Sequence, residues 1–235
     1  MVVAILIGSN HMHAQQMTTT YEHLTPTEKS IITIASLTAK GDLENLKPAF
    51  NNGLEVGLTV NQIKEVLVHL YAYCGFPRSI LGLQTFMVVL DERKAKGIND
   101  MVGVNASAIS GNGTKYDRGK AILAELTKTP QAGPPKGYSA FAPVIDTFLK
   151  EHLFADIFER DVLTYSQREL ATIAVISTIG DADPMLQGHL SISLNVGISP
   201  EKLKEFIAII KKTAGRKKAK SAKKVLAEVL KNQTE

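Results

Sequence analysis

The chain of 235 residues is long enough to bury a real core, in one large domain or two small ones. Its 44% hydrophobic and 21% charged residues are ordinary for a soluble globular protein, and its single cysteine excludes a disulfide framework, a CxxC pair and a cysteine-rich zinc site. The formal charge of +4 is local, because residues 211–224 carry eight Lys and Arg and no acid. We expect these cations to form the solvated face of a C-terminal helix, rather than a nucleic-acid or membrane surface.

The N-terminal residues 1–8 form an apolar run, MVVAILIG, which polar residues follow. The run resembles the end of a secretory signal peptide with cleavage near Ala14, although the positively charged start is missing. It is too short to span a bilayer, and no other segment is expected to be transmembrane. We therefore expect 1–16 to be a signal-peptide remnant or a disordered leader. The protein would then be periplasmic or secreted, with a cytoplasmic location as the alternative.

Two segments of the chain predict equivalent helices. The first follows Thr25 and ends at Gly41, and the second follows Thr164 and ends at Gly180. Threonine suits the N-cap of a helix and glycine suits its end. The likeness continues, because 54–59 (LEVGLT) matches 194–199 (LNVGIS) and Gly75 falls opposite Gly215. The sequence thus contains a duplicated helical unit of roughly 70 residues.

The duplication organises the chain. The first repeat is expected over 17–97, and the second over 143–235, ending in the basic helix. Between them, 98–142 reads as a linker with one helix over 116–129, because Gly-, Asn-, Ser- and Pro-rich stretches flank that segment. Strand-like alternation is not convincing anywhere in the chain, so the fold class is all-α.

The segment 65–84 (EVLVHLYAYCGFPRSILGLQ) carries the candidate chemistry. Glu65 and His69 are four residues apart, so they project from one helix face and can touch, and Tyr73 lies one turn further along it. The pair could shuttle protons to or from a bound acid or peroxide. In the purely structural alternative, Glu65 is a salt-bridge partner and His69 is a surface residue.

Cys74 lies next to a predicted helix break at 75–77, because Pro77 cannot continue a helix but can begin one. The thiol would then sit just before a helix N-terminus and near Arg78, where a thiolate is favoured. The alternative is that Cys74 is a small buried hydrophobe.

The second repeat holds Arg168 and Glu169 at the start of one helix and His189 at the predicted start of the next. The first repeat has Ala49 at the position of His189, and the second has Ala214 at the position of Cys74. Each copy therefore lacks part of what the other holds, which indicates a composite site or a site in the first copy alone. No HxxxH or HExxH spacing occurs in the body of the chain, so no metal site is expected.

These residues resemble the repeat of the carboxymuconolactone decarboxylase family. The resemblance rests on 168–174 (RELATIA), Gly180, His189 and 194–199 in the second repeat, on 65–69 (EVLVH) and 73–78 (YCGFPR) in the first, and on 116–120 (YDRGK) in the linker. It covers most of the chain from Leu24 to Leu230.

The resemblance implies an all-helical fold that assembles as a homo-oligomer, a trimer or hexamer, with sites in clefts near subunit interfaces. Some members of the family decarboxylate a lactone acid with a pocket acid or base and no cofactor. The related alkylhydroperoxidase D proteins reduce peroxides with a CxxC pair beside a Glu and a His. This chain departs from the second pattern, because Cys74 has no partner three residues away. It also departs from the decarboxylase pattern. The first repeat has Ala49 at the histidine position, and the second repeat has the basic run in place of a Cys-Gly-Phe-Pro segment.

We therefore expect a cofactor-independent lyase that decarboxylates a small organic acid, with no nucleic-acid or membrane partner. The catalytic candidates are Glu65, His69, Cys74 and His189, and the substrate-binding candidates are Tyr73, Phe76 and Arg78, of which Arg78 would hold a carboxylate. One alternative is a peroxiredoxin-type peroxidase that uses Cys74 and an external thiol. The other is a non-catalytic helical oligomer.

Overall fold

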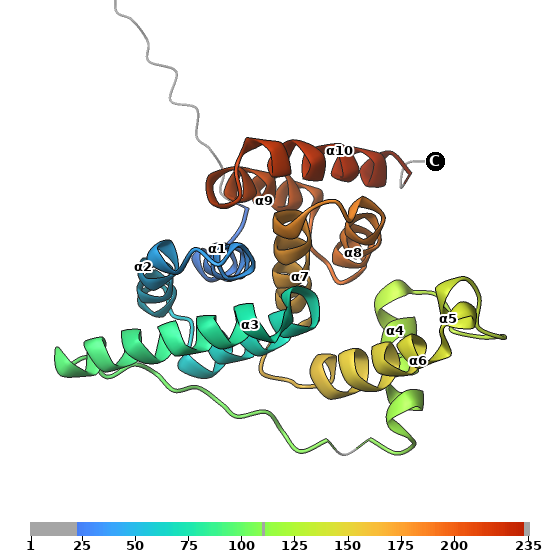
Figure 1. Ribbon diagram of the computed structural model, residues 1–235, viewed down its shortest axis with the longest axis horizontal. Coiled ribbons are helices and arrows are strands. Elements are labelled where there is room, and N and C mark those ends of the chain that lie inside the picture. The colour runs from blue at the N-terminus through green and yellow to red at the C-terminus, as the bar shows by residue number, and fades with distance from the viewer. Residues whose placement is uncertain (1–22, 110, 233–235) are drawn as a thin grey trace, which may run out of the picture.

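The computed structural model describes residues 23–109 and 111–232, which contain helices and no strand. The first repeat comprises α1 (Pro26–Lys40), α2 (Leu43–Glu55) and α3 (Val60–Ala95). The second comprises α7 (Tyr165–Ile179), α8 (Asp183–Asn195), α9 (Pro200–Thr213) and α10 (Arg216–Asn232). Between them lie α4 (Lys115–Thr127), α5 (Tyr138–Phe141), α6 (Pro143–Thr147) and the π-helix η1 (Phe148–Phe158). The duplicated all-α fold is confirmed (Figure 1), and the expected leader lies outside the described residues.

The helix ends follow from local sequence, as expected. Thr25 and Thr164 each accept a hydrogen bond from the backbone N–H three residues on, and Glu28 and Gln167 bond back to the cap. These reciprocal bonds are capping boxes, which satisfy backbone donors that a helix start leaves unpaired. Gly41 ends α1 with a φ of 74°, a left-handed conformation that glycine adopts without strain.

The predicted break near Cys74 is a kink inside α3. Gly75 has a φ of 79° and a ψ of 161°, so the helix is interrupted there and resumes at Pro77. Only glycine adopts that φ at low cost. The kink separates the half of α3 that carries Glu65 and His69 from a second half that runs along the outside of the molecule (Figure 1).

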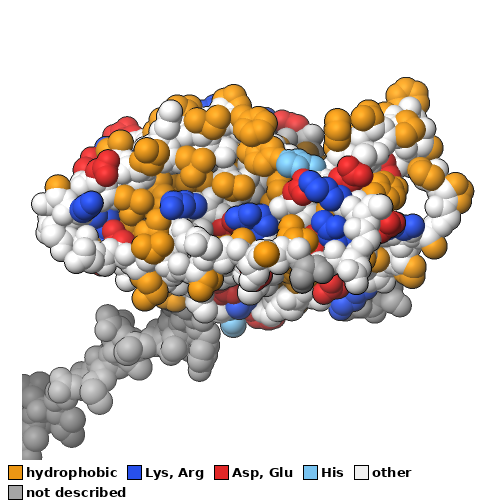
Figure 2. Space-filling view, turned by 90° about the horizontal axis from the view of Figure 1, so that it is seen from below, with side chains coloured by type: hydrophobic (Ala, Val, Ile, Leu, Met, Phe, Trp, Pro, Cys, Tyr) orange, Lys and Arg blue, Asp and Glu red, His pale blue; other side chains and the backbone are white. Residues whose placement is uncertain are grey.

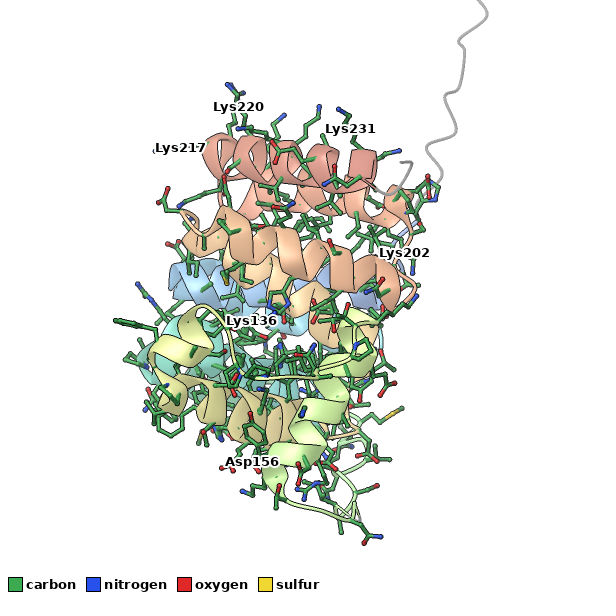
Figure 3. All side chains as sticks on the ribbon, turned by 90° about the vertical axis from the view of Figure 1, so that its right-hand side faces the viewer. Lys136, Asp156, Lys202, Lys217, Lys220 and Lys231 are labelled. Carbon is green, nitrogen blue, oxygen red and sulfur yellow. The ribbon has the colours of Figure 1, made fainter. Side chains whose placement is uncertain are left out.

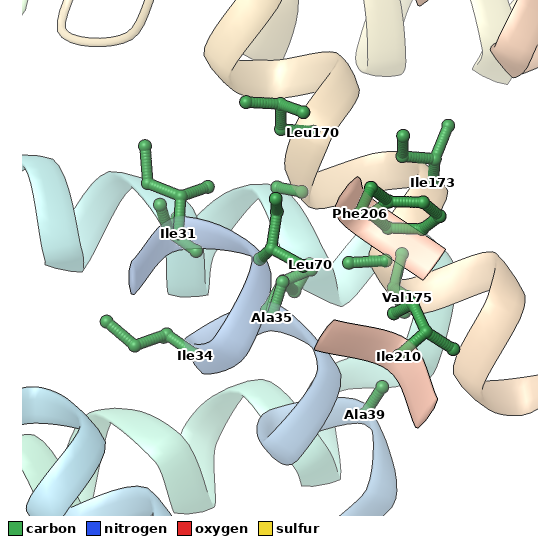
Figure 4. Packing of buried hydrophobic residues seen from close by; sticks show 14 of the residues in the cluster. Ile31, Ile34, Ala35, Ala39, Leu70, Leu170, Ile173, Val175, Phe206 and Ile210 are labelled. Atoms are coloured by element: carbon green, nitrogen blue, oxygen red, sulfur yellow. The ribbon is translucent and has the colours of Figure 1, made fainter. Parts of the chain in front are cut away.

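The two repeats pack as a pseudo-symmetric pair. α1 lies against α7, and each of these also packs against the third helix of the other repeat, α7 against α3 and α1 against α9. Ile31 and Leu170 are equivalent by sequence, and both lie in the core that the two repeats share (Figure 4). At its centre Ser36 Oγ lies 2.8 Å from Thr178 Oγ1 and 2.7 Å from Thr213 Oγ1. Every site on these faces is therefore built from both repeats.

The linker helices form a separate layer beside this core. α4 packs on η1 so closely that a Cβ at Gly119 would lie 1.8 Å from the backbone oxygen of Lys150. Phe154 and Phe158 of η1 join Ile122 and Leu126 of α4 in a small second apolar cluster. Phe158 thereby lies over the junction of α3 and α7, where the candidate residues are found.

One expectation is corrected here. His189 does not begin a helix, because α8 begins six residues earlier, with Pro184 in its first turn. Separately, α3 is the one helix of the described residues that is long and apolar enough to cross a membrane by length and composition alone. Core helices of soluble proteins meet the same criterion, and α3 carries the charged Glu65 in the protein interior.

Candidate active site between the two repeats

The candidate site lies where the first half of α3 meets α7 and α8, so each repeat supplies part of it. Six polar side chains of these helices come together in the interior or at its edge. They are Glu65, His69 and Tyr73 from the first repeat, and Arg168, Glu169 and His189 from the second. The composite site that the sequence suggested is thus what the fold brings together.

Glu65 is an ion-pair partner rather than a neighbour of His69. Its Oε1 lies 2.7 Å from Arg168 Nη2 and 2.9 Å from Arg160 Nε, and its Oε2 accepts from Arg160 Nη2 at 2.9 Å. Burial alone would raise the pKa of this carboxyl, but the hydrogen bonds from the two arginines overcome that effect and lower it. Glu65 therefore stays a charged anchor for Arg168.

Arg168 is fully buried, with an exposed fraction of 0%. Besides Glu65, its Nη2 donates to the backbone oxygen of Arg160 at 2.6 Å. Its Nε and Nη1 have no hydrogen-bond partner in the described part of the chain. Buried donors are seldom left unpaired, so these two N–H groups mark a place where water or a substrate oxygen would be held.

His69 is also fully buried, which rules out its reading as a surface residue. Its Nε2 lies 2.8 Å from Thr172 Oγ1, and Thr172 donates its one hydroxyl proton to the backbone oxygen of Arg168. The hydroxyl must then accept from His69, so the proton is on Nε2 and Nδ1 is bare. Burial first, and then the charge of Arg168, hold the pKa of His69 well below 6.5. The imidazole is therefore neutral.

His189 forms the outer, accessible part of the cluster. Its Nδ1 lies 3.0 Å from Oε2 of Glu169, whose side chain is fully buried, while the His189 side chain is 17% exposed. A carboxylate oxygen can only accept, so Nδ1 carries the proton and Nε2 is left as a base. Such a carboxylate–histidine pair fixes both the tautomer and the direction of the ring.

Tyr73 connects the two histidines. Its ring centroid lies 5.2 Å from that of His69 and 5.9 Å from that of His189. Burial, followed by the negative charge of Glu169, raises the pKa of the phenol, so it remains protonated. Its hydroxyl makes no hydrogen bond of good geometry among the described residues, although the nearby Thr172 hydroxyl lowers the pKa of the phenol in part. It is a neutral donor held beside the Glu169–His189 pair.

The remaining predicted site residues lie outside this cluster. Cys74 is half-buried and its Sγ lies 3.3 Å from the backbone oxygen of Leu70. The expectation of a favoured thiolate is wrong, because burial raises the pKa of the thiol to about 11 and the charge of Arg78 offsets only part of that. Phe76 is 62% exposed and stacks on Tyr71, and Arg78 is on the surface against the backbone of Gly41.

The internal duplication supplies a comparison site. The positions equivalent to Arg168, Glu169, His189 and Tyr73 are Lys29, Ser30, Ala49 and Thr213. A cavity of about 410 Å³ at the corresponding place is lined in part by Thr33, Ala49 and Thr213. The lining of this cavity has no histidine and therefore no carboxylate–imidazole pair. Of the two places related by the duplication, the one that holds Glu169 and His189 is thus the one with groups for proton transfer.

Sequence reasoning missed one residue of the cluster and undervalued two. Arg160 follows η1 and precedes the first of the segments that match between the repeats, so no spacing pointed to its bond with Glu65. Arg168 and Glu169 served as markers of the repeat, and their adjacency in sequence, an unusual charged pair inside an apolar helix, was the available signal. Among the described residues no group of three or more His, Cys, Asp or Glu could hold a metal ion.

Comparison with known proteins gives a match to one family. The model of the carboxymuconolactone decarboxylase family matches the chain twice, over residues 10–84 and 143–228. A search of curated proteins finds no match. The two matched regions cover more than half of the chain and carry, respectively, the α3 side and the α7–α8 side of the site. The chain therefore belongs to the carboxymuconolactone decarboxylase family.

Proposed function

We propose that this protein is a cofactor-independent enzyme that decarboxylates a small organic acid, with His189 as the proton carrier. The observation that carries the proposal is the Glu169–His189 pair, in which a fully buried carboxylate holds a partly exposed imidazole at 3.0 Å. A base of this kind, oriented by a second group, is the usual arrangement for general acid–base catalysis. The substrate would reach His189 from the surface.

The reaction requires an acid in which the carbon that bears the carboxylate is bonded to a carbonyl, as in a β-keto acid, or is conjugated to one through a double bond, as in an unsaturated lactone. When the carbon–carbon bond to the carboxylate breaks, CO₂ leaves and the electron pair moves onto that group as an enolate. His189 takes a proton from solvent on Nε2 and delivers that proton to carbon, which returns the ring to its neutral form. Tyr73, a neutral donor that makes no hydrogen bond of good geometry among the described residues, would stabilise the enolate oxygen.

The charges around the site suit an anionic substrate. Arg168 contributes a buried positive charge whose Nε and Nη1 are unpaired among the described residues, and Glu65 and Arg160 keep it in place. In this proposal Glu65 positions Arg168 instead of moving protons. Arg78 remains a candidate for holding a carboxylate, since it is exposed at the surface in the first turn after the kink at Gly75.

The peroxidase alternative receives no support from the thiol, whose raised pKa disfavours the reactive thiolate. A homo-oligomer, by contrast, has an observation in its favour. The second half of α3 exposes a row of large apolar side chains, Phe76, Ile80, Leu81, Met87 and Val88. Figure 2 shows apolar side chains spread over the face seen from below. We propose that a second copy of the chain covers this surface.

The test is CO₂ release from a panel of lactone acids and β-keto acids. We expect Glu169→Gln to lower kcat by about 10²–10⁴-fold, because the amide no longer fixes the tautomer or stabilises the protonated ring. His189→Ala should lose as much, whereas Cys74→Ser should leave the rate unchanged. If Cys74→Ser abolished consumption of peroxide while Glu169→Gln left CO₂ release intact, the peroxidase would replace our proposal. Absence of either turnover, with intact oligomers by light scattering, would favour a non-catalytic role.

A further inference from the structure

A groove between α9 and α10 is lined by four of the eight cations of the basic run, which the proposed reaction does not use. Its volume is about 860 Å³. Its floor is apolar and includes Ile207, Ala208, Ala219 and Leu226, and its rim is formed by Lys204, Lys211, Arg216, Lys220 and Lys223. We refer to it as the α9–α10 groove. Figure 3 shows Lys217 and Lys220 of α10 on the outer edge of the molecule, directed away from the body.

The rim carries positive charge without matching acids. None of its five cations forms a salt bridge in the part of the chain that the structure describes, and no acid lines the groove. Lys204 has Glu201 one turn before it on α9, but the other four have no comparable neighbour among the groove residues. Four like charges on two adjacent helices repel one another, and a bound anion would relieve that repulsion.

The first repeat shows that packing does not require these cations. Tyr71 and Phe76 hold the positions of Lys211 and Arg216, and their rings stack with centroids 4.5 Å apart and an interplanar angle of 17°. The first repeat thus fills the equivalent surface with its own aromatic side chains. In the second repeat the same surface is left open and cationic.

The inward-facing positions of the two helices, in contrast, have the same burial in both repeats. Phe86 and Leu226 are equivalent, as are Val89 and Val229, and all four are buried. The burial of the helix pair is therefore kept, while the side chains of the groove change: Val68 corresponds to Ala208 in the floor, and the aromatic rim of the first repeat is cationic in the second. A smaller floor residue together with a cationic rim indicates a ligand rather than a structural need.

The combination of an apolar floor and a cationic rim specifies the ligand chemistry. Pockets of this volume hold single small molecules, and an apolar lining with a few charged groups selects for shape and charge together. The groove lining contains no aromatic side chain on which a nucleic-acid base could stack. Along α10 the lining extends from Arg216 to Leu226, a length of about 15 Å at the helical rise.

We propose that the α9–α10 groove binds one free, medium-chain aliphatic carboxylate, with its chain on the apolar floor and its carboxylate on the rim. The site is distinct from the Glu169–His189 pair and does not depend on the proposed reaction. Lysine and arginine bind carboxylates through charge-assisted hydrogen bonds, and the alanines of the floor leave room for the chain.

The experiment is calorimetric titration of the full chain with monomeric decanoate, decanol and butyrate. We expect decanoate to bind, and decanol and butyrate each to bind at least about tenfold more weakly, because one lacks the charge and the other the chain. The double variant Lys211→Glu, Lys220→Glu should lose at least about tenfold in decanoate affinity. Its matched control, Lys217→Glu with Lys128→Glu, changes the net charge equally outside the groove and should retain affinity.

A third variant, Ala208→Phe, fills the floor without changing charge and should also weaken decanoate binding. All the substituted positions are exposed, Ala208 included, and far-UV circular dichroism checks that each variant is folded. Equal loss in the groove variant and its control would overturn the proposal, since it would show only a long-range effect of net charge. Equal binding of decanol, no binding of decanoate, or binding only to anionic phospholipid vesicles would overturn it as well.

Discussion

Glu65 of the first repeat and Arg168 of the second form an ion pair of 2.7 Å in which both side chains are buried. The duplication repeats this pairing in reverse, because Glu205 of the second repeat lies 2.9 Å from Lys29 of the first. The second pair is more exposed, at 27% for Lys29 and 22% for Glu205. Related by the internal symmetry but different in burial, the two pairs form a matched test and control.

Removing the charge of Glu65 should destabilise the fold strongly. Glu65→Gln leaves Arg168 buried without its counter-charge, and breaking a buried pair in this way costs about 3–5 kcal/mol. Glu205→Gln should cost clearly less, because solvent screens the charge of Lys29. Urea unfolding followed by circular dichroism at pH 7 measures both. Equal losses in the two variants would mean that the buried pair is not a special anchor.

The burial of neutral His69 should make the protein less stable in mild acid. Its pKa is held well below the value of 6.5 expected when unfolded, so the unfolded chain takes up a proton that the folded chain does not. This contribution to stability is complete at pH values above 6.5, the pKa of the unfolded chain. It is lost as the pH falls below 6.5, at up to about 1.4 kcal/mol per pH unit. Unfolding measured between pH 7 and 5 should show the slope.

The matched variants for that slope are His69→Gln, which removes it, and His152→Gln, which should leave it unchanged. His152 is exposed and lies on η1. A slope that persists in His69→Gln would assign it to another group.

Cys74 should react slowly with thiol reagents. A pKa of about 11 leaves little thiolate at pH 7.5, so alkylation by iodoacetamide should be about 10–100-fold slower than that of a free thiol. The rate should still be rising at pH 9.5, as mass spectrometry of the labelled protein would show. A plateau reached below pH 8 would instead indicate an activated thiolate and revive the peroxidase.

The contact of α4 with η1 should be sensitive to a single methyl group. In Gly119→Ala the new Cβ would meet the backbone oxygen of Lys150, so the helices must separate and Phe158 must move away from His69. We expect a loss of about 1–3 kcal/mol, as for overpacking of a core. Gly188→Ala, where a Cβ meets nothing within 4 Å, should instead gain about 0.5–1 kcal/mol from helix propensity. Thermal unfolding compares the two, and a loss in both would contradict the steric argument.

The expectation of export concerns residues outside the described part of the chain and has its own test. We predict that mass spectrometry of the protein isolated from its natural source finds an N-terminus near Ala14. Retention of residues 1–14 in that sample would show that the apolar run is not a cleaved signal.

Much of this fold follows from the sequence alone. Thr25, Thr164, Gly41 and Gly75 act through their own backbone conformation or that of the next turn, so helix starts, ends and the kink could be predicted without knowing any distant contact. The duplication was equally visible, because helix periodicity and caps recur at a spacing of 139 residues early and 140 later. What each copy lacks indicated either a composite site or a site in the first copy alone, and the tertiary structure decided between them.

The chemistry of the site depended on the tertiary structure. Spacing on one helix placed Glu65 beside His69, but the fold gives Glu65 to Arg168 and Arg160, residues about a hundred positions away in sequence. Cys74 likewise looked activated from the nearby helix start, whereas the apolar surroundings that raise its pKa come from packing. Local sequence determines backbone geometry, but burial and the partners of a charge are properties of the whole fold. For that reason the sequence determined the helices and their repeat, and only the packing of one repeat on the other decided which side chains share a proton, a charge or a cavity.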